Sequence, residues 1–551
     1  SSATSVTATV LTDLGGTAGT TVWKLGSYSS TTGFPKAVHF FEQRLMLAAT
    51  AVEPNGVWGS AIGLTEDMTP GATDSDALDY TLATRDQTSV QWLAALQRDL
   101  FCGTLQSEIN LTGGDTILKP DSPQVVPNSF IGSVGIMPIF AGNSILFIDR
   151  TALSVMELSL ITDSVTRQKF RTLDLNWHAS DITSGGITRS CYQKNPENVA
   201  WFVLSGGTLA SLSYDRVNSV IAWHTHELGG VSGTATITVT DYANIVIGTT
   251  ITITKSDGST VTFTSEASSG SSPTGLNGWR PNESNNTTAD NIFTAINAHS
   301  DFTVANPASN VVTVLETTRS GSLPLKITTS DSTRLAAVNE TAPIVESVSV
   351  IPAAGSAAGS NSQVWVTIQR TINGSTHRYV EYLHTSVYTD STYVYSGSAI
   401  TSLTGLHHLE GNTVVVKADG SRIPNTNVSD GTISLGASYT EVEAGLPYTH
   451  TLVTQVPDIT ISSNSMAGMK RRIHRVILRF VASLGSTVNG DAIIYRKAGD
   501  PMDAAPPAYT GDKSFVVDNE WGREGTITIT GHDPYAFELS ALITSANLNQ
   551  E

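Results

Sequence analysis

Charge, and positive charge above all, is scarce in this sequence. Only 15% of its residues are Asp, Glu, Lys or Arg, against about a quarter in a typical soluble protein. The 49 acidic residues outnumber the 31 basic ones, and the formal net charge is −18. This sign argues against a protein that grips nucleic acid through Lys and Arg contacts with phosphates, and against one that binds anionic membrane surfaces.

Cysteine and long apolar runs are nearly missing as well. Cys102 and Cys191 lie in apolar, strand-like contexts, so we expect free buried thiols, although one disulfide is possible. No apolar run reaches the roughly 18 residues of a transmembrane helix, so no membrane insertion by this chain is expected. The start, SSATSVTATVLTDLGG, lacks the basic and apolar regions of a signal peptide. We expect the chain to begin partway through a larger product.

Glycine, serine and threonine are plentiful, and strand-like phrases recur at a regular interval. The composition, with 46 Gly, is typical of an all-β protein with many turns. Four phrases span 37–60, 89–114, 135–160 and 186–228. Their starts are about 50 residues apart, the repeat length of four-stranded propeller blades. Stacked sheets of this kind cover one another's faces. Another β stack, such as a sandwich with chance spacing, is the alternative.

Short polar turns separate the strands inside these phrases. The turns are Gln97-Arg98, Gly142-Asn143, Gly206-Gly207 and, in a fifth phrase at 345–384, Asn373-Gly374. Such turns favour tight β-hairpins.

A stretch of different character separates the fourth and fifth phrases. Residues 231–343 combine strands predicted at 234–240, 250–254, 259–264, 311–315 and 323–328 with an amphipathic helix at 288–299. We predict that Thr288 or Asp290 is the N-cap of this helix. The stretch is interpreted as an α+β unit inserted into a loop of the propeller.

The predicted fold is mainly β: a β-propeller with an inserted small α+β domain and an additional small β domain. The predicted parts are an N-terminal segment (1–36), the first propeller blades (37–230), the inserted α+β domain (231–343), a blade after the insertion (344–402), a small β domain (403–460) and a C-terminal β region able to close the propeller (461–551).

Two groupings resemble metal or acid–base sites, but both are weak. Asp74, Asp76 and Asp79 lie close together, yet they lack the central Gly and distal Glu of a calcium loop, so a solvated loop is favoured. His224 and His226 share one face of a strand and can ligate zinc only with a third ligand, which does not follow at a fixed spacing. A surface strand is favoured for them.

One dense basic run, Lys470, Arg471, Arg472 and Arg475, precedes an apolar strand. It is interpreted as the charged start of that strand, or alternatively as a contact with an acidic neighbouring subunit. No nucleophile elbow, phosphate-binding loop, dinucleotide fingerprint or CxxC pair occurs. The sequence therefore predicts a non-enzyme, with no catalytic, cofactor-binding or metal residues and no cofactor.

The phrase VWKLGSYSSTTGFPKAVHFFEQRLMLAAT…PNGVWGS resembles the tail nozzle proteins of short-tailed bacteriophages, the tail tubular protein B family. Further similar phrases follow in the same order at 76–114, 209–230, 405–420 and 442–450. The resemblance covers most of 22–230 and 363–480. It rests on structural residues, among them Trp58, Gly59, Tyr214, Asp215, Trp223, Gly411 and Pro447. Family members usually carry more chain before the phrase that contains Trp23.

The resemblance implies a structural function in a virion. Nozzle proteins form a six-fold ring below the tail adaptor, around the channel through which the genome leaves, with fibres or spikes attached nearby. The implied partners are five further copies in a homohexamer, the tail adaptor, tail fibres or spikes, and viral DNA that passes without specific binding. The implied location is the virion tail, after synthesis in the cytoplasm of the bacterial host.

A second interpretation comes from another class of protein. A carbohydrate-binding or carbohydrate-active β-propeller, secreted or on a virion, would use the Asp74, Asp76 and Asp79 carboxylates together with surface Trp rings. Trp279, in a polar loop, is the ring on which a sugar would stack.

Overall fold

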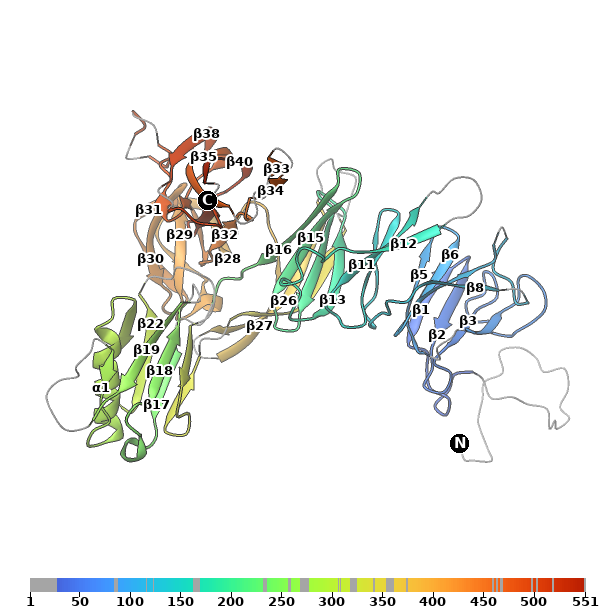
Figure 1. Ribbon diagram of the computed structural model, residues 1–551, viewed down its shortest axis with the longest axis horizontal. Helices are drawn as coiled ribbons and strands as arrows, with labels where there is room; N and C mark the ends of the chain where they lie inside the picture. The colour runs from blue at the N-terminus through green and yellow to red at the C-terminus, as the bar shows by residue number, and fades with distance from the viewer. Residues whose placement is uncertain are drawn as a thin grey trace. The chain divides into compact units, whose positions relative to one another are not determined.

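The fold is described from a computed structural model, shown in Figure 1. It describes residues 27–83, 88–114, 116–121, 123–161, 169–230, 235–255, 259–267, 277–305, 307, 309–317, 325–339, 342–352, 361–372, 375–457, 460–461, 464–465, 469–496, 499–501, 504–517 and 520–549. The chain forms two compact units, Ser1–Ser180 and Asp181–Glu551. The division falls inside the stretch 37–230 predicted as one run of blades.

The first unit contains three four-stranded antiparallel sheets, each formed by strands that pair in sequence order. We call them blade 1, blade 2 and blade 3. Their strands are, for blade 1, β1 (Ala37–Phe41), β2 (Arg44–Ala48), β3 (Gly56–Gly59) and β4 (Leu78–Thr81); for blade 2, β5 (Val90–Leu96), β6 (Asp99–Thr104), β7 (Glu108–Thr112) and β8 (Gln124–Ser129); and for blade 3, β9 (Ile139–Ala141), β10 (Ser144–Ile148), β11 (Val155–Ile161) and β12 (Lys169–Asp174).

Two-residue turns set the register of the hairpins in these blades. Leu96 pairs with Asp99 across the turn at Gln97, whose φ is 56°, and Ala141 pairs with Ser144 across Gly142, whose φ is 61°. Left-handed backbone at these positions matches the twist of paired strands. The hairpins predicted at Gln97-Arg98 and Gly142-Asn143 are therefore confirmed.

The cores of the first unit lie between neighbouring blades. One cluster joins blade 1 to blade 2 through Met46, Leu78, Leu93 and Leu111, and a second joins blade 2 to blade 3 through Trp92, Phe101, Phe147 and Leu158. Each blade alone is a single sheet that cannot bury its apolar side chains. A hydrophobic core forms only where two neighbouring blades pack face to face.

The second unit opens with blade 4 and later adds a three-stranded sheet that we call blade 5. The strands are β13 (Ile187–Gln193), β14 (Val199–Leu204), β15 (Leu209–Asp215) and β16 (Val220–His226) in blade 4, and β25 (Ile344–Ile351), β26 (Gln363–Ile372) and β27 (Ser375–Tyr382) in blade 5. Gly207 follows β14 with φ 83°, inside the predicted turn. The turn predicted at Asn373-Gly374 lies outside the described residues.

An α+β domain lies between these two blades in the sequence. Two four-stranded sheets and one helix share a single hydrophobic core, and Figure 1 shows α1 beside the sheets. The elements are β17 (Ala235–Val239), η1 (Tyr242–Asn244), β18 (Thr250–Thr254), β19 (Thr260–Ser265), β20 (Gly278–Trp279), α1 (Asn285–Asn297), β21 (Phe302–Ala305), β22 (Val311–Glu316), β23 (Lys326–Thr329) and β24 (Leu335–Val338).

The predicted N-cap of α1 is wrong. Ser284 caps the helix, since its side chain accepts a hydrogen bond from the Thr287 backbone N–H at 3.1 Å. Thr288 is buried inside the first turn, and its hydroxyl accepts from the Asn282 N–H at 3.0 Å. The helix begins three residues earlier than expected because Ser284 supplies the extended backbone and the oxygen that a cap requires.

A small β sheet and a C-terminal β region complete the second unit. The small sheet has the order β28-β31-β29-β30, and the C-terminal region contains sheets β32-β39-β36-β37 and β38-β35-β40 and the pair β33-β34. The elements are β28 (Asp390–Thr404), η2 (His407–Leu409), β29 (Thr413–Ala418), β30 (Ser421–Asn427), β31 (Thr432–Leu446), β32 (His450–Val453), β33 (Thr460–Ile461), β34 (Asn464–Ser465), β35 (Lys470–Ser483), β36 (Thr487–Val488), β37 (Asp491–Ala492), β38 (Tyr509–Val516), β39 (Thr528–Gly531) and β40 (Leu539–Asn549).

Strand pairing assigns some residues to other sheets than the predicted boundaries imply. β28 begins at Asp390 and pairs with β31, so 390–402 belong to the small β sheet and not to the preceding blade. β32 pairs with β39, so 450–453 belong to the C-terminal region. That region has its own core, which includes Val476, Phe480 and Ile529. That it closes the propeller stays a prediction.

The fold class is confirmed: the chain is nearly all β, with four-stranded antiparallel sheets as propeller blades, an inserted small α+β domain and an additional small β domain. Within the described residues, no helix combines the length and apolar character required to cross a membrane.

Candidate functional site

The Asp74–Asp79 loop is held by its backbone, and its carboxylates do not converge. The buried guanidinium of Arg44 donates to the carbonyls of Asp74 (2.6 Å), Asp76 (2.5 Å) and Ser60 (2.7 Å). The Asp76 carboxylate accepts from the Thr73 N–H and hydroxyl, which holds its pKa below the usual value. Asp74 instead pairs with Lys119 at 2.7 Å. The solvated loop is thus stabilised by an arginine that the sequence reasoning did not single out.

The two histidine rings of β16 contact each other edge to face. His224 and His226 lie with ring centroids 5.0 Å apart, and His226 also contacts the Trp201 ring and hydrogen bonds to the Ser211 hydroxyl at 2.6 Å. Burial, with the neighbouring His224, lowers the pKa of His226 to about 3. Among the described residues, no group of three or more His, Cys, Asp and Glu is placed to hold a metal ion.

The basic run divides between the two faces of β35. Arg471 is fully buried and donates to the Pro457 carbonyl, whereas Arg475 is exposed and donates to the Ser514 hydroxyl at 2.7 Å. Further along the strand, Arg479 pairs with Asp512 at 2.7 Å. The run is therefore not a single basic patch, because a register shift between Ile473 and Arg475 breaks the alternation of the strand and turns Arg475 away from the face of Arg471.

Trp279 does not offer a ring to a ligand. Its exposed fraction is 0%, and it lies in the core of the inserted domain with Phe263 and Ile292. β20 pairs with β19 in parallel at this point, so Trp279 lies in a strand although the sequence around it is polar. The expectation of a sugar-stacking surface ring is wrong for this residue.

Both cysteines are free thiols, as predicted. Cys102 is buried in blade 2 and Cys191 is half-buried in blade 4. Burial raises the pKa of each thiol to about 12, so neither is activated as a nucleophile.

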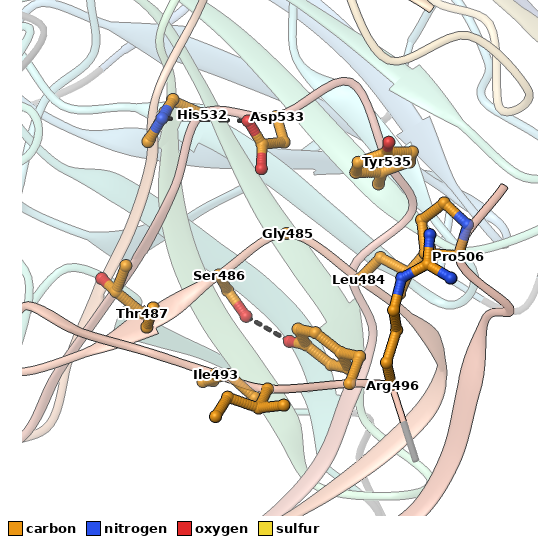
Figure 2. Close-up of a pocket in the computed structure, with 13 residues that line it drawn as sticks. Leu484, Gly485, Ser486, Thr487, Ile493, Arg496, Pro506, His532, Asp533 and Tyr535 are labelled. Atoms are coloured by element: carbon orange, nitrogen blue, oxygen red, sulfur yellow. Dashed lines mark hydrogen bonds and ion pairs between the residues drawn. The ribbon is translucent and has the colours of Figure 1, made fainter. Parts of the chain in front are cut away.

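The C-terminal region contains a pocket of about 390 Å³, shown in Figure 2. The dashed line at Ser486 marks its hydrogen bond with the Tyr495 hydroxyl. His532 lies 3.8 Å from the Asp533 carboxylate, which also pairs with Arg422. Ser486 thus has a phenol as its partner and not a base, so the lining residues that the structure describes form no nucleophile–base pair.

The guanidinium of Arg496, which also lines this pocket, is hydrogen-bonded to backbone carbonyls. Arg496 donates to the Ala504 carbonyl at 2.8 Å and to the Pro501 carbonyl. The Tyr535 hydroxyl accepts from the Arg422 backbone N–H at 2.8 Å. These contacts brace the loops around the pocket.

A buried ionic cluster joins blade 4, blade 5 and the small β sheet. We call Gly229, Arg370, Glu381 and Asp390 the junction cluster. Arg370 is fully buried and makes a bidentate pair with Glu381 at 2.9 and 3.1 Å. A third nitrogen of Arg370 donates to the Gly229 carbonyl, while the Gly229 N–H donates to the Asp390 carboxylate. Both the backbone carbonyl and the backbone N–H of Gly229 are thus hydrogen-bonded, directly before the inserted domain begins in the sequence.

Close packing explains why glycine occupies this position. A Cβ on Gly229 would lie 2.6 Å from the Pro447 carbonyl oxygen and 3.0 Å from the Leu446 Cβ. Burial raises the pKa of Asp390 to about 6, although Arg370 and the Gly229 N–H act in the opposite direction. The cluster therefore positions structural elements and includes one carboxyl able to titrate in mildly acidic solution.

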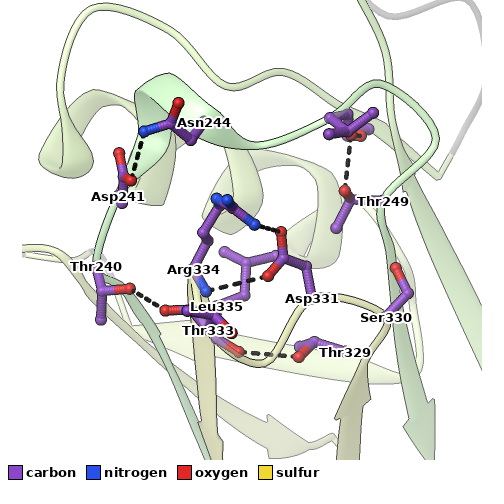
Figure 3. Close-up of polar contacts among 12 residues, drawn as sticks. Thr240, Asp241, Asn244, Thr249, Thr329, Ser330, Asp331, Thr333, Arg334 and Leu335 are labelled. Carbon is purple, nitrogen blue, oxygen red and sulfur yellow. Dashed lines mark hydrogen bonds and ion pairs between the residues drawn. The ribbon is translucent and has the colours of Figure 1, made fainter.

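One end of the inserted domain is closed by polar side chains, as Figure 3 shows. Arg334 pairs with Asp331 at 2.8 Å, and the Thr240 hydroxyl donates to the Thr333 carbonyl at 2.8 Å. Thr329 donates to the Leu335 carbonyl at 2.9 Å. These bonds fix the loops between strands.

The residues on which the phage-protein resemblance rests lie in packed contacts and turns. Trp58 is buried beside the Tyr28 ring, and a Cβ on Gly59 would lie 2.8 Å from the Met46 sulfur. Asp215 accepts from the backbone N–H of Val217 at 2.9 Å and so closes the turn between β15 and β16.

The other members of this set fit the same description. Tyr214 is buried, Trp223 contacts the Phe202 ring at 5.3 Å, and Gly411 has a φ of 74° that favours glycine. Pro447 supplies the carbonyl that faces Gly229. Trp23 lies outside the described residues.

Comparison with known proteins assigns no family. No family model and no curated protein match the chain. Solved structures that it resembles include the WD40 domain of SCAP from fission yeast (7% identity, TM-score 0.25, covering 90% of this chain and 91% of that chain). Others are the N-terminal domain of Nup159 (9%, 0.22, 91% and 90%) and an ACO/RPE65 chimera (6%, 0.21, 61% and 66%). Likeness at this level carries no argument about function.

Proposed function

We propose that this chain is a structural subunit of a bacteriophage tail, a nozzle that forms a ring around the DNA ejection channel below the tail adaptor. The observation that carries the proposal is the series of blades built on the residues of the resemblance. Trp58 and Gly59 stabilise blade 1, and Tyr214 and Asp215 stabilise blade 4. These residues support a scaffold, and the proposal is for a scaffold without covalent chemistry.

The contacts of the ionisable groups support the same interpretation. The carboxylates of the Asp74–Asp79 loop, the histidines of β16 and the charges of the C-terminal pocket do not form a nucleophile–base pair in the described structure. Buried guanidinium groups such as those of Arg370 and Arg44 donate hydrogen bonds to backbone carbonyls.

The proposed partners are five further copies in a homohexamer, the tail adaptor, and tail fibres or spikes, with the virion tail as the location. Viral DNA would pass through the ring without specific binding. The surplus of acidic residues, −18 per chain, supports a wall that releases no counterions from DNA and so adds no affinity. Screening limits such repulsion to about 8–10 Å at physiological salt, so it acts only in a narrow channel.

The carbohydrate interpretation depends on an exposed Trp279 ring, and this ring is buried. A sugar platform needs an exposed ring, and Trp279 is enclosed in the core of the inserted domain. The Asp74 carboxylate is also committed to an ion pair with Lys119.

Electron microscopy of the purified protein tests the proposal, with glycan binding assayed on the same sample. The expected result is a six-fold ring with a central channel and no retention on glycans. Solitary particles that bind or hydrolyse a glycan would contradict it. A mobility-shift assay with duplex DNA should show no complex at physiological salt, and a salt-sensitive complex would contradict the acidic-channel hypothesis.

A further inference from the structure

The junction cluster holds the chain at the point where the inserted domain begins. Arg370 of β26 donates to the Gly229 carbonyl, and the carboxylate of Asp390, the first residue of β28, accepts from the Gly229 N–H. One residue is therefore fastened to blade 5 through its carbonyl and to the small β sheet through its N–H.

The next residue lies equally close to the cluster. Gly230 has a φ of 89°, and a Cβ at this position would lie 2.5 Å from the Leu446 Cδ1 and 3.2 Å from the Arg370 Nη1. Only glycine lets the backbone approach so closely with this φ. The entry to the inserted domain is thus seated directly on the buried guanidinium.

The charges of the cluster do not balance. It contains one guanidinium, that of Arg370, and two carboxylates, those of Glu381 and Asp390. Arg370 is fully buried and makes its bidentate pair with Glu381. Asp390 is partly buried and forms no ion pair among the described residues. Its carboxylate therefore lacks a direct counter-charge in a site where an ionised group is costly.

The groups that β29, β31 and their flanking segments bring toward Asp390 do not supply this charge. Glu443 of β31 pairs with Lys417 of β29, so the two add no net charge. The Tyr388 ring lies 4.8 Å from the Lys417 Nζ. Tyr448, after β31, is a phenol whose pKa burial raises to about 12, so it stays neutral.

One histidine lies next to the cluster. His408 of η2 hydrogen bonds through Nε2 to the Ser391 carbonyl at 3.0 Å, and the Ser391 hydroxyl donates to Glu381 at 3.0 Å. Histidine side chains ordinarily titrate in the same pH range as a carboxyl raised by burial. The experiment therefore needs a variant that separates His408 from Asp390.

We propose that the junction cluster is a proton-operated latch on the entry to the inserted domain. In mildly acidic solution Asp390 takes up a proton, the cluster is neutral, and Gly229 is held against blade 5 and the small β sheet. At neutral pH the surplus negative charge favours local opening around Gly229, which hydrates the carboxylate. The inference concerns this junction alone and does not depend on the proposed ring.

The direction of the latch follows from linkage between opening and the proton. Burial raises the pKa of Asp390 to about 6, whereas the hydrated carboxyl of the opened segment has the ordinary value of 3.8. Opening therefore releases a proton and becomes easier as the pH rises from about 4 to about 6. The fraction of opened segment should be about tenfold larger at pH 7 than at pH 5.

Hydrogen–deuterium exchange of the full chain, read by mass spectrometry, tests the latch. Exchange in the peptide that contains Gly229 and Gly230 is divided by the intrinsic chemical rate at each pH. We expect its protection to fall about tenfold from pH 5 to pH 7, while β18 in the core of the inserted domain keeps its protection. Constant protection at Gly229, or an equal loss in β18, overturns the latch.

Two variants test the charge count. Asp390→Asn keeps an oxygen for the Gly229 N–H and should abolish the pH dependence. Glu381→Gln removes the surplus charge from the other carboxylate, so protection at pH 7 should rise toward its value at pH 5. A pH dependence that survives Asp390→Asn, or is unchanged in folded Glu381→Gln, overturns the proposal. Circular dichroism that matches the parent checks folding.

Two matched controls should retain the pH dependence of the parent. His408→Gln removes the neighbouring histidine, and a loss of the pH dependence in this variant would overturn the assignment to Asp390. Asp215→Asn alters a carboxylate that also accepts from a backbone N–H, that of Val217, but lies outside the cluster. A loss of the pH dependence in Asp215→Asn would likewise overturn a role specific to the junction.

Discussion

At the scale of single residues, Asp390 links the junction cluster to pH. Its pKa is about 6 in the folded chain, above the ordinary value of 3.8. The folded state therefore binds this proton more tightly than the unfolded state does. The resulting stabilisation is fully present below about pH 4 and is lost as the pH rises through about 6.

Asp390→Asn should remove this pH dependence, because an amide oxygen still accepts from the Gly229 N–H but does not titrate. The free energy of unfolding of the wild type, relative to the variant, should fall by at most about 3 kcal/mol between about pH 4 and pH 7. Urea denaturation at several pH values measures it. Parallel curves for the two proteins would show that Asp390 titrates normally.

Trp279 is fully buried, although its polar sequence context predicts an exposed ring. Trp279→Ala should lower the free energy of unfolding of the inserted domain by about 3–5 kcal/mol, since it leaves a large cavity in the core. Trp177→Ala is the matched control, because the Trp177 ring is 78% exposed and its loss should cost under about 0.5 kcal/mol. Equal effects in chemical denaturation would contradict the assigned burial.

At the scale of elements, the N-terminus of α1 depends on one side chain. Ser284→Ala should cost about 0.5–2 kcal/mol through loss of the bond to the Thr287 N–H. Asp290→Ala, at an exposed helical position, should change stability much less. Thermal unfolding of both variants compares them. A larger loss from Asp290→Ala would return the cap to the position expected from sequence.

The blades could be predicted from sequence because their signal is local. Alternating apolar residues and two-residue turns, such as Gln97-Arg98, specify hairpins without any knowledge of distant contacts. Trp279 and Ser284 could not be assigned this way, because their places depend on β19 and on the start of a helix whose apolar pattern begins later. Arg370 did carry a signal: it falls on the same alternation as Val364, Val366 and Ile368, which placed an arginine on a buried face.

The ionic sites show a second limit of sequence reasoning. Asp74, Asp76 and Asp79 are close in sequence, yet what organises their loop is Arg44, about thirty positions away on β2. The junction cluster likewise joins Gly229 to residues more than a hundred positions later. Such pairings require the folded strands, since no local pattern specifies which carbonyl a buried guanidinium will hold.

At the scale of the whole molecule, neighbouring blades share cores within each of the two units, blades 1 to 3 in the first and blades 4 and 5 in the second. The net charge of −18, the ion pair of the buried Arg370 and the raised pKa of the Cys102 thiol support the proposed function as a scaffold around a passage for DNA.

The mass of the particle that the purified chain forms tests the proposed nozzle most directly. Sedimentation or mass photometry should give six times the 58.2 kDa of one chain, with little material at intermediate sizes because a closed ring leaves no free end. A particle of one chain mass at every concentration examined, with native circular dichroism, would contradict the nozzle.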